Sequence, residues 1–304
     1  MHLQVAVVVV SFNTRDLLLD CVASVFESAQ GRSIELVIVD NASEDDSYQA
    51  LREAYPQAGA IRNSSNIGFG AACNQGIRAT TARFILLLNS DAMLTAPAFQ
   101  TLCDYLERNE RCGAAGCRLT DADGNEVTNT RNFLTPFNQV FELSGVESGL
   151  RPLKRTHQPI LDRDLVDCTV DWIDGACLML KRDALDEVGL FDERFFMYSE
   201  DEDLCFRLRK LGWLVCFCAA GTAVHYGAAS SSLNRIEMLR YFYSSQLLFL
   251  SIHRNDRSAF IYAVLMKIIL QLKKTLLPDS ARRKTAREQL LALKEAWAAR
   301  DRNR

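Results

Sequence analysis

The chain has 304 residues, and its content of 48% hydrophobic and 24% charged residues is that of a globular protein with one large domain, or one domain and an appendage. Its net charge of −3 is unevenly distributed, because residues 254–304 hold 13 Lys and Arg against 5 Asp and Glu. The rest of the chain is therefore strongly acidic, which argues against a general nucleic-acid-binding protein.

The first third of the chain alternates predicted strands with predicted helices. Continuous apolar runs predict strands that are buried on both faces at 5–10, 36–39 and 84–88. The helical spacing of apolar residues predicts helices at 16–28, 45–55, 67–79 and 97–108. This alternation predicts βαβ units and therefore an α/β fold with a mostly parallel central sheet and flanking helices.

Polar side chains follow the first two predicted strands, at the edge where parallel sheets bind their ligands. Ser11 and Asn13 follow the first strand, and Asp40 and Asn41 follow the second. The Asp40 carboxylate can accept a hydrogen bond from a nucleobase N–H or a ribose hydroxyl, or it can close an Asx-turn. The same two interpretations are open for Ser11 and Asn13.

The third apolar run ends at Asn89-Ser90-Asp91. A carboxylate at the end of a parallel strand can bind a divalent cation, and the cation can neutralise a nucleotide diphosphate. The alternative is an ordinary helix N-cap or turn.

The glycine-rich segment NIGFGAACNQGI covers residues 66–77. It has neither the register of a G-x-G-x-x-G motif nor the G-K-[ST] ending of a P-loop. It predicts either a tight loop before a helix or a close approach of the backbone to a nucleotide or sugar, with Asn66 and Asn74 as polar contacts.

Four consecutive acids, Glu200 to Asp203, stand in the segment MYSEDEDLCFRL behind the aromatic residues Phe195, Phe196 and Tyr198. Acids at a helix start are favoured by the helix dipole, so a solvated acidic helix terminus is one interpretation. The flanking aromatic residues favour the other, a half-buried site in which a carboxylate with a raised pKa acts as a base.

The remaining predicted elements are short strands around 117–119 and 168–172, a strand at 215–224 and an amphipathic helix at 236–253. His225 ends the strand at 215–224 beside Gly227. It is either a structural histidine or a metal ligand that acts together with Asp91.

The order of these motifs is more specific than any one of them. S-F-N, D-N-A-S, N-I-G-F-G-x-A-x-N-x-G, L-L-L-N-S-D, G-A-x-x-M-L-x-R, V-G-x-F-D-E-x-F-F-M-Y-x-E-D-x-D-L-x-x-R-L-x-x-x-G-W and H-Y-G-x-x-S follow one another between residues 5 and 254. This series resembles the family 2 inverting glycosyltransferases with the GT-A fold. Within that family it looks most like the rhamnosyltransferase-type group that builds bacterial surface polysaccharides.

The resemblance implies catalytic and metal-binding roles. Asp91 matches the metal-binding carboxylate of a D-x-D motif whose first Asp is here Asn89, and His225 matches a ligand of the metal or the diphosphate. Asp201 matches the catalytic base, with Glu200 and Asp203 supporting it.

The resemblance also implies two groups of binding residues. Asp40 matches a nucleobase-binding carboxylate, and the residues on the acceptor side are Trp172, Asp174 and Gly175. The full set implied to bind the nucleotide sugar is Ser11, Phe12, Asn13, Asp40, Asn41, Asn66, Gly68, Phe69, Gly70, Asn74, Asn89 and Ser90.

The implied reaction needs Mg²⁺ or Mn²⁺ and moves a sugar from a dTDP- or UDP-sugar to a lipid-linked or growing glycan. L-Rhamnose from dTDP-rhamnose is the first expectation, and UDP-galactofuranose, UDP-GlcNAc and UDP-glucose remain open. A second hypothesis is a nucleotide-sugar binding module without catalysis. An NAD-dependent dehydrogenase is disfavoured, because no G-x-G-x-x-G follows the first strand.

We expect a catalytic domain at 1–254 and a basic, amphipathic helical tail at 255–304. The tail fits a helix on the inner surface of the cytoplasmic membrane, and its alternative is packing on the catalytic domain or on a second subunit in a homodimer. No apolar run reaches the roughly 20 residues of a membrane span. Together with ten cysteines that read as free buried thiols, this predicts a cytoplasmic protein, peripheral at the membrane.

Overall fold

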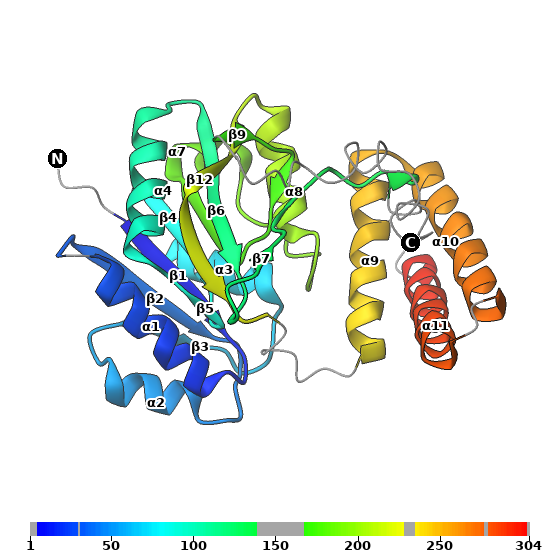
Figure 1. Cartoon of the computed structure of the whole chain (residues 1–304), viewed down its shortest axis with the longest axis horizontal. Coiled ribbons are helices and arrows are strands. Elements are labelled where there is room, and N and C mark those ends of the chain that lie inside the picture. The colour runs from blue at the N-terminus through cyan, green and yellow to red at the C-terminus, as the bar shows by residue number, and fades with distance from the viewer. Residues whose placement is uncertain (1–4, 30, 139–166, 228–234, 277–278, 303–304) are drawn as a thin grey trace. The chain divides into compact units, whose positions relative to one another are not determined.

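The computed structural model describes residues 5–29, 31–138, 167–227, 235–276 and 279–302 (Figure 1). The chain forms two compact units. The sheet unit comprises Met1–Arg131, Ile160–Arg194 and Asp201–Ser232, and the helical unit comprises Asn132–Pro159, Phe195–Glu200 and Leu233–Arg304. The predicted domain boundary after Arg254 stays a prediction.

The sheet unit is built around one mixed sheet in the order β3-β2-β1-β4-β11-β6-β12-β5. Its strands are β1 Val5–Ser11, β2 Ile34–Asp40, β3 Gly59–Arg62, β4 Phe84–Asn89, β5 Ala92–Met93, β6 Cys112–Thr120, β11 Cys177–Lys181 and β12 Leu214–His225. Two short strands, β7 Glu126–Val127 and β9 Cys168–Thr169, pair with β6 and β12. β3, β2, β1 and β4 pair in parallel, as do β6 and β12, and β11 runs antiparallel between the two groups. The prediction of a mostly parallel central sheet is confirmed.

Helices flank this sheet (Figure 1). They are α1 Arg15–Ala29, α2 Ser47–Ala54, α3 Phe69–Arg78, α4 Ala96–Arg108, α7 Arg182–Val188 and α8 Glu200–Lys210. The predicted helices end within about two residues of these bounds. The start of α3 is later than predicted, because Gly68 has a φ of 90° and interrupts the helix.

The core lies against both faces of the central strands. Residues Val5–Val9 of β1 are at most 2% exposed, as their continuous apolar run predicts. Gly76 of α3 faces this strand, and a Cβ at that position would clash with Val8 Cγ1. Gly76 is therefore needed for close packing of the helix on the sheet. The sequence placed it only in a glycine-rich segment that could form a tight loop or approach a ligand.

The helical unit contains α9 Arg235–His253, α10 Asp256–Leu276 and α11 Ser280–Arg302, which pack on one another (Figure 1). Among the described residues, no helix is both long enough and apolar enough to cross a membrane. All ten cysteines are free thiols, and nine of them are buried.

Candidate active site

The parallel pairing of β1, β2 and β4 brings the predicted polar residues to one edge of the sheet. Ser11 at the end of β1 is the register partner of Asp40 at the end of β2. On the other side, Val10 is the register partner of Asn89 at the end of β4. Three polar clusters that lie tens of residues apart in the chain therefore share the carboxyl edge, where ligands of α/β proteins bind.

Asp40 is fully buried, and its two carboxylate oxygens differ in their partners. Oδ1 accepts a hydrogen bond from the Ser43 backbone N–H at 3.1 Å and lies 3.7 Å from Arg62 Nε. Oδ2 is buried without a hydrogen-bond partner. Oδ1 thus bonds a backbone N–H three residues on, one residue beyond the partner that an Asx-turn would have. A buried carboxylate oxygen without a donor is costly, which leaves Oδ2 available for the N–H or O–H of a ligand.

Asn41 holds the glycine-rich segment in place. Its Nδ2 donates to Asn66 Oδ1 at 2.8 Å and to the Gly68 carbonyl at 3.3 Å, and its Oδ1 accepts from the Ile67 N–H at 3.1 Å. The structure therefore shows the tight turn before a helix, and the approach of its backbone to a nucleotide or sugar stays a prediction. Asn66 shapes the turn as well, because its Oδ1 accepts from the Asn41 amide and from the Gly68 N–H.

Ser11 belongs to a chain of three hydroxyl groups. Its Oγ lies 3.1 Å from Thr14 Oγ1, which donates to Ser90 Oγ at 2.9 Å. Ser11, Thr14 and Ser90 are all at most 4% exposed. Thr14 was missed by sequence reasoning, although it directly follows the S-F-N motif. The link ties the end of β1 to the loop after β4.

Asn13 adopts a φ of 54°, in the left-handed region. Its N–H donates to Ser43 Oγ at 3.0 Å, and its Oδ1 accepts from the Glu44 N–H at 2.8 Å. The loops after β1 and β2 are thereby joined. Phe12, between Ser11 and Asn13, is half-buried.

Asp91 and His225 meet although 134 positions separate them. β12 pairs with β5 in a register that sets His225 opposite Ala92. His225 Nε2 then lies 3.2 Å from Asp91 Oδ1 and 3.4 Å from Asn89 Nδ2. α4 is capped by Thr95, so the N-cap interpretation of this segment is wrong, whereas Ser90 and Asp91 do form a turn, as the other half of that alternative had it.

A divalent metal fits this pair. The Asp91 carboxylate is a suitable donor for Mg²⁺ or Mn²⁺, and the His225 imidazole suits a transition-metal ion such as Mn²⁺ better than Mg²⁺; the two side chains are only 3% and 19% exposed. Within the described residues, no group of three or more acids, cysteines or histidines could hold a metal. Such a site suits an ion that completes its shell with substrate phosphates and water.

Asp201 stands in the first turn of α8. Its Oδ2 accepts from the Gly175 N–H at 3.0 Å, and its Oδ1 accepts from the Glu202 N–H at 2.8 Å. Burial raises the pKa of the Asp201 carboxyl, and these two N–H groups act against that rise. A Cβ on Gly175 would lie 3.3 Å from Phe69 Cε1 and 3.9 Å from Asp201 Oδ2. Phe69, which is predicted to bind the nucleotide sugar, therefore lies near Asp201, the predicted base.

Trp172 and Asp174 lie beside Arg131, which sequence reasoning missed. β10 Trp172–Ile173 pairs with β8 Thr130–Arg131, so that Trp172 is opposite Arg131. Arg131 Nε is 3.6 Å from Asp174 Oδ1, and the guanidinium lies 5.9 Å from the centre of the Trp172 ring. Burial and then the Asp201 carboxylate raise the pKa of Asp174 to about 7, although 30% of its side chain remains accessible.

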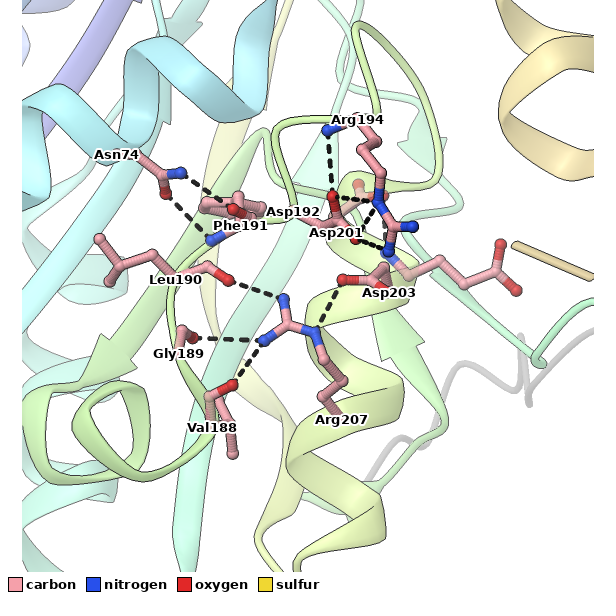
Figure 2. Close-up of polar contacts among 11 residues, drawn as sticks. Asn74, Val188, Gly189, Leu190, Phe191, Asp192, Arg194, Asp201, Asp203 and Arg207 are labelled. Atoms are coloured by element: carbon pink, nitrogen blue, oxygen red, sulfur yellow. Dashed lines mark hydrogen bonds and ion pairs between the residues drawn. The ribbon is translucent and has the colours of Figure 1, made fainter. Parts of the chain in front are cut away.

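The start of α8 carries buried acids, so the interpretation of a solvated acidic terminus is wrong. Glu200, Glu202 and Asp203 are 5%, 4% and 1% exposed. Asp203 Oδ2 accepts from Arg207 Nε at 2.8 Å, and the Arg207 guanidinium also donates to the carbonyls of residues 188, 189 and 190 (Figure 2). Arg207 therefore anchors α8 to the preceding segment, and Asp203 holds the guanidinium in place from within the same helix.

Asn74 fixes the same segment from α3 (Figure 2). It is fully buried, its Oδ1 accepts from the Phe191 N–H at 3.0 Å, and its Nδ2 donates to the Phe191 carbonyl and to Glu193 Oε1 at 2.9 Å each. Directly after Phe191, Asp192 forms an ion pair with Arg194. A ligand contact by Asn74 stays a prediction, and it would require these bonds to open.

Replacing Arg131 by Gln should move the acidic limb of the pH profile of kcat/KM to higher pH by about one unit. Arg131 lowers the pKa of both Asp174 and Asp201. Without this cation the carboxyls hold their protons to higher pH, and a base works only when deprotonated. Steady-state rates between pH 5 and 9 give the shift. Arg131→Lys keeps the charge and should keep the limb near that of the wild type. An equal shift in both variants would contradict the electrostatic explanation.

Comparison with known proteins agrees with this arrangement. The model of the family described as glycosyl transferase family 2 matches residues 6–189. The chain therefore belongs to glycosyl transferase family 2, and it is a glycosyltransferase. Family membership favours an enzyme over the non-enzymatic binding module.

Two relatives and one solved structure illustrate the relationship. An N-acetylglucosaminyl-diphospho-decaprenol L-rhamnosyltransferase of Mycobacterium tuberculosis is 28% identical over 247 residues, which cover 73% of this chain and 76% of the relative. Rhamnosyltransferase WbbL of Escherichia coli is 30% identical over 146 residues, or 47% of this chain and 52% of the relative. A mannosyltransferase from Pyrobaculum calidifontis, solved with GDP-Man and Mn²⁺, has a TM-score of 0.56 at 16% identity, covering 97% of this chain and 86% of that one. The last likeness confirms the GT-A fold.

Proposed function

We propose that this enzyme transfers L-rhamnose from dTDP-rhamnose, with inversion, to a hydroxyl group of a lipid-linked or growing glycan in the synthesis of a cell-surface polysaccharide. The observation that carries the proposal is the setting of Asp201. It is a carboxylate with a raised pKa, held by two backbone N–H groups beside Phe69 and Gly175. A base for a hydroxyl proton needs this combination of position and basicity.

The donor is proposed to bind along the carboxyl edge of the sheet. The unpartnered Oδ2 of Asp40 would accept from the nucleobase or ribose. The other residues that the resemblance implies are proposed to line the nucleotide-sugar pocket or to hold its loops, and they are Ser11, Phe12, Asn13, Asn41, Asn66, Gly68, Phe69, Gly70, Asn89 and Ser90. Asp91 and His225 would hold the divalent ion, which offsets the charge of the departing nucleoside diphosphate when it is bound.

The reaction is proposed to be a single displacement. The acceptor hydroxyl oxygen forms a bond to the anomeric carbon from the face opposite the diphosphate, and the bond from that carbon to the diphosphate oxygen breaks. Asp201 takes the hydroxyl proton, and the nucleoside diphosphate leaves with the bonding electrons. Glu200 and Asp203 support Asp201 from the same helical turn. Trp172, Asp174 and Gly175 lie on the acceptor side, where the Trp172 ring offers a flat apolar surface to a sugar.

The names of the relatives support rhamnose as the sugar and a diphospho-polyprenol as the carrier of the acceptor. UDP-galactofuranose, UDP-GlcNAc and UDP-glucose are the alternative donors. A lipid-linked acceptor would place the enzyme at the cytoplasmic face of the membrane.

A donor panel tests the proposal. The full-length enzyme is incubated with Mn²⁺ or Mg²⁺, a short-chain water-soluble GlcNAc-diphospho-lipid, and dTDP-rhamnose or one of the three UDP-sugars. Mass spectrometry should show one added rhamnose with dTDP-rhamnose and no product with the other donors. Transfer from a UDP-sugar alone would refute the rhamnose assignment. A thermal-shift series with dTDP and UDP should agree, because a ligand at 100 times its Kd adds about 2.7 kcal/mol of stability.

A further inference from the structure

One helix of the helical unit is apolar on two sides. α10 buries Ala259, Tyr262, Met266 and Leu270, which are all 0% exposed. α10 packs against α9 and α11 (Figure 1), and the hydroxyl of the buried Tyr262 donates to Gln246 of α9. The bundle alone therefore accounts for one apolar face of α10, as expected for an amphipathic helix.

A second apolar face of α10 is exposed. Its members recur at intervals of four residues, so that each is turned about 40° from the one before and the five together cover an arc of about 160°. They are Phe260, Val264, Ile268, Leu272 and Leu276, which are 57%, 38%, 51%, 50% and 74% exposed, with Ile261 at 42% beside them. An exposed stripe of large apolar side chains over some four turns is far more than the isolated exposed residues of a normal surface.

The charges along this stripe have a single sign. From residue 257 to residue 276, α10 contains Arg257, Lys267, Lys273 and Lys274 and no acid. At 100° per residue, Arg257 falls within the arc of these exposed apolar residues and Lys267 lies at its border, and both side chains are exposed. Lys274 lies on the other side of the helix from Leu272 and Leu276 and is half-buried.

We propose that the exposed face of α10 lies in the surface of an anionic lipid bilayer, with the helix axis parallel to the membrane and its exposed cations at the headgroups. An apolar stripe bordered by cations has the two features that such binding requires, burial of apolar area and attraction to anionic lipid. The inference rests on the proposed function in one respect: membrane binding would bring the enzyme to a lipid-linked acceptor.

The same charges disfavour a second copy of the chain as the occupant. In a twofold interface formed by this face, the cations of one α10 would face those of the other, with no acid between residues 257 and 276 on either helix. An anionic lipid surface satisfies the apolar stripe and the cations together, so it is the occupant that the observations favour.

Vesicle flotation with the full-length protein tests the proposal. Vesicles of phosphatidylcholine with 40% phosphatidylglycerol should carry wild-type protein upward, and pure phosphatidylcholine vesicles should carry less. Ile268→Glu should lower the partition coefficient at least tenfold. Leu211→Glu is the matched control, because Leu211 is 48% exposed against 51% for Ile268 but lies in the sheet unit. This control should float like the wild type.

The charge contribution is tested by an Arg257→Gln, Lys267→Gln variant. It should lose binding to the anionic vesicles and keep the weak binding to neutral ones. Failure of the wild-type protein to float, or equal flotation of the Ile268→Glu and Leu211→Glu proteins, would overturn the proposal. A third result would also overturn it: light scattering finds that the wild-type protein is a dimer, and Ile268→Glu separates this dimer into monomers but leaves flotation unchanged. Transfer to the water-soluble acceptor separates this proposal from the proposed function, since Ile268→Glu should leave that rate unchanged.

Discussion

Replacing Asp201 by Asn should lower kcat for sugar transfer by about 10²- to 10⁴-fold, the usual contribution of a general base. The amide keeps the shape of the carboxylate, and its one oxygen can still accept from the Gly175 N–H, which donates to Oδ2 at 3.0 Å in the wild type, although the bond from the Glu202 N–H to Oδ1 is then lost. It cannot take a proton from the acceptor hydroxyl. The loss should therefore fall on kcat, while the KM of the donor and the nucleotide-induced thermal shift stay near their wild-type values.

Asp192→Asn is the matched control for this change. Asp192 is a carboxylate of the same chain segment, but its partner is Arg194, through a bond of 2.6 Å at the surface. Its removal should leave kcat within about threefold of the wild type. Transfer by Asp201→Asn at more than a tenth of the wild-type rate would exclude Asp201 as the base. A loss of nucleotide binding in that variant would point to a structural defect.

The strands and helices could be predicted where one local pattern decides them. The runs VAVVVV and FILLL are apolar on both faces of their strands, and the structure buries them between helices on a parallel sheet. β11, with the sequence CLMLK, is just as apolar and fully buried, yet it was not predicted as a strand. Its five residues lie between Gly175 and α7, and the hydrophobic periodicity of so short an apolar run cannot distinguish a strand from a buried helix segment. Only its antiparallel pairing with β4 and β6 defines it.

The residues of the candidate site also fall into two groups, those that a local pattern predicts and those that only the tertiary structure brings into place. The ends of strands β1, β2 and β4 are local features, so their polar residues could be placed at one edge from the sequence. Arg131 could not, because nothing in its own segment distinguishes it and only the pairing of β8 with β10 brings it to Trp172. The hydrogen bonds of Asn41 and Asn74 depend on loops that lie 25 and 117 positions away, and long-range geometry of this kind leaves no local signal.

Replacing Asp91 by Asn should remove the metal dependence of nucleotide binding. The change takes one negative charge from the proposed metal site, whose carboxylate and imidazole lie 3.2 Å apart. Loss of even an outer-shell partner typically costs about 10- to 100-fold in metal affinity, and Asp91 would be a direct ligand. The Mn²⁺ concentration for half-maximal effect should rise at least 100-fold. Titration of Mn²⁺ by electron paramagnetic resonance with dTDP present, together with thermal shifts, measures this without any turnover.

The control for Asp91→Asn is Asp123→Asn, which removes the same charge from an exposed loop and should leave both measurements unchanged. His225→Asn should resemble Asp91→Asn in direction, because β5 and β12 hold the two side chains together. If Asp91→Asn bound Mn²⁺ and nucleotide as the wild type does, the Asp91–His225 contact would be a structural pair that joins β12 to the loop after β4. The diphosphate charge would then have to be met by the protein's own cations, and Arg62 beside Asp40 and Arg131 beside Asp174 would be the first to replace.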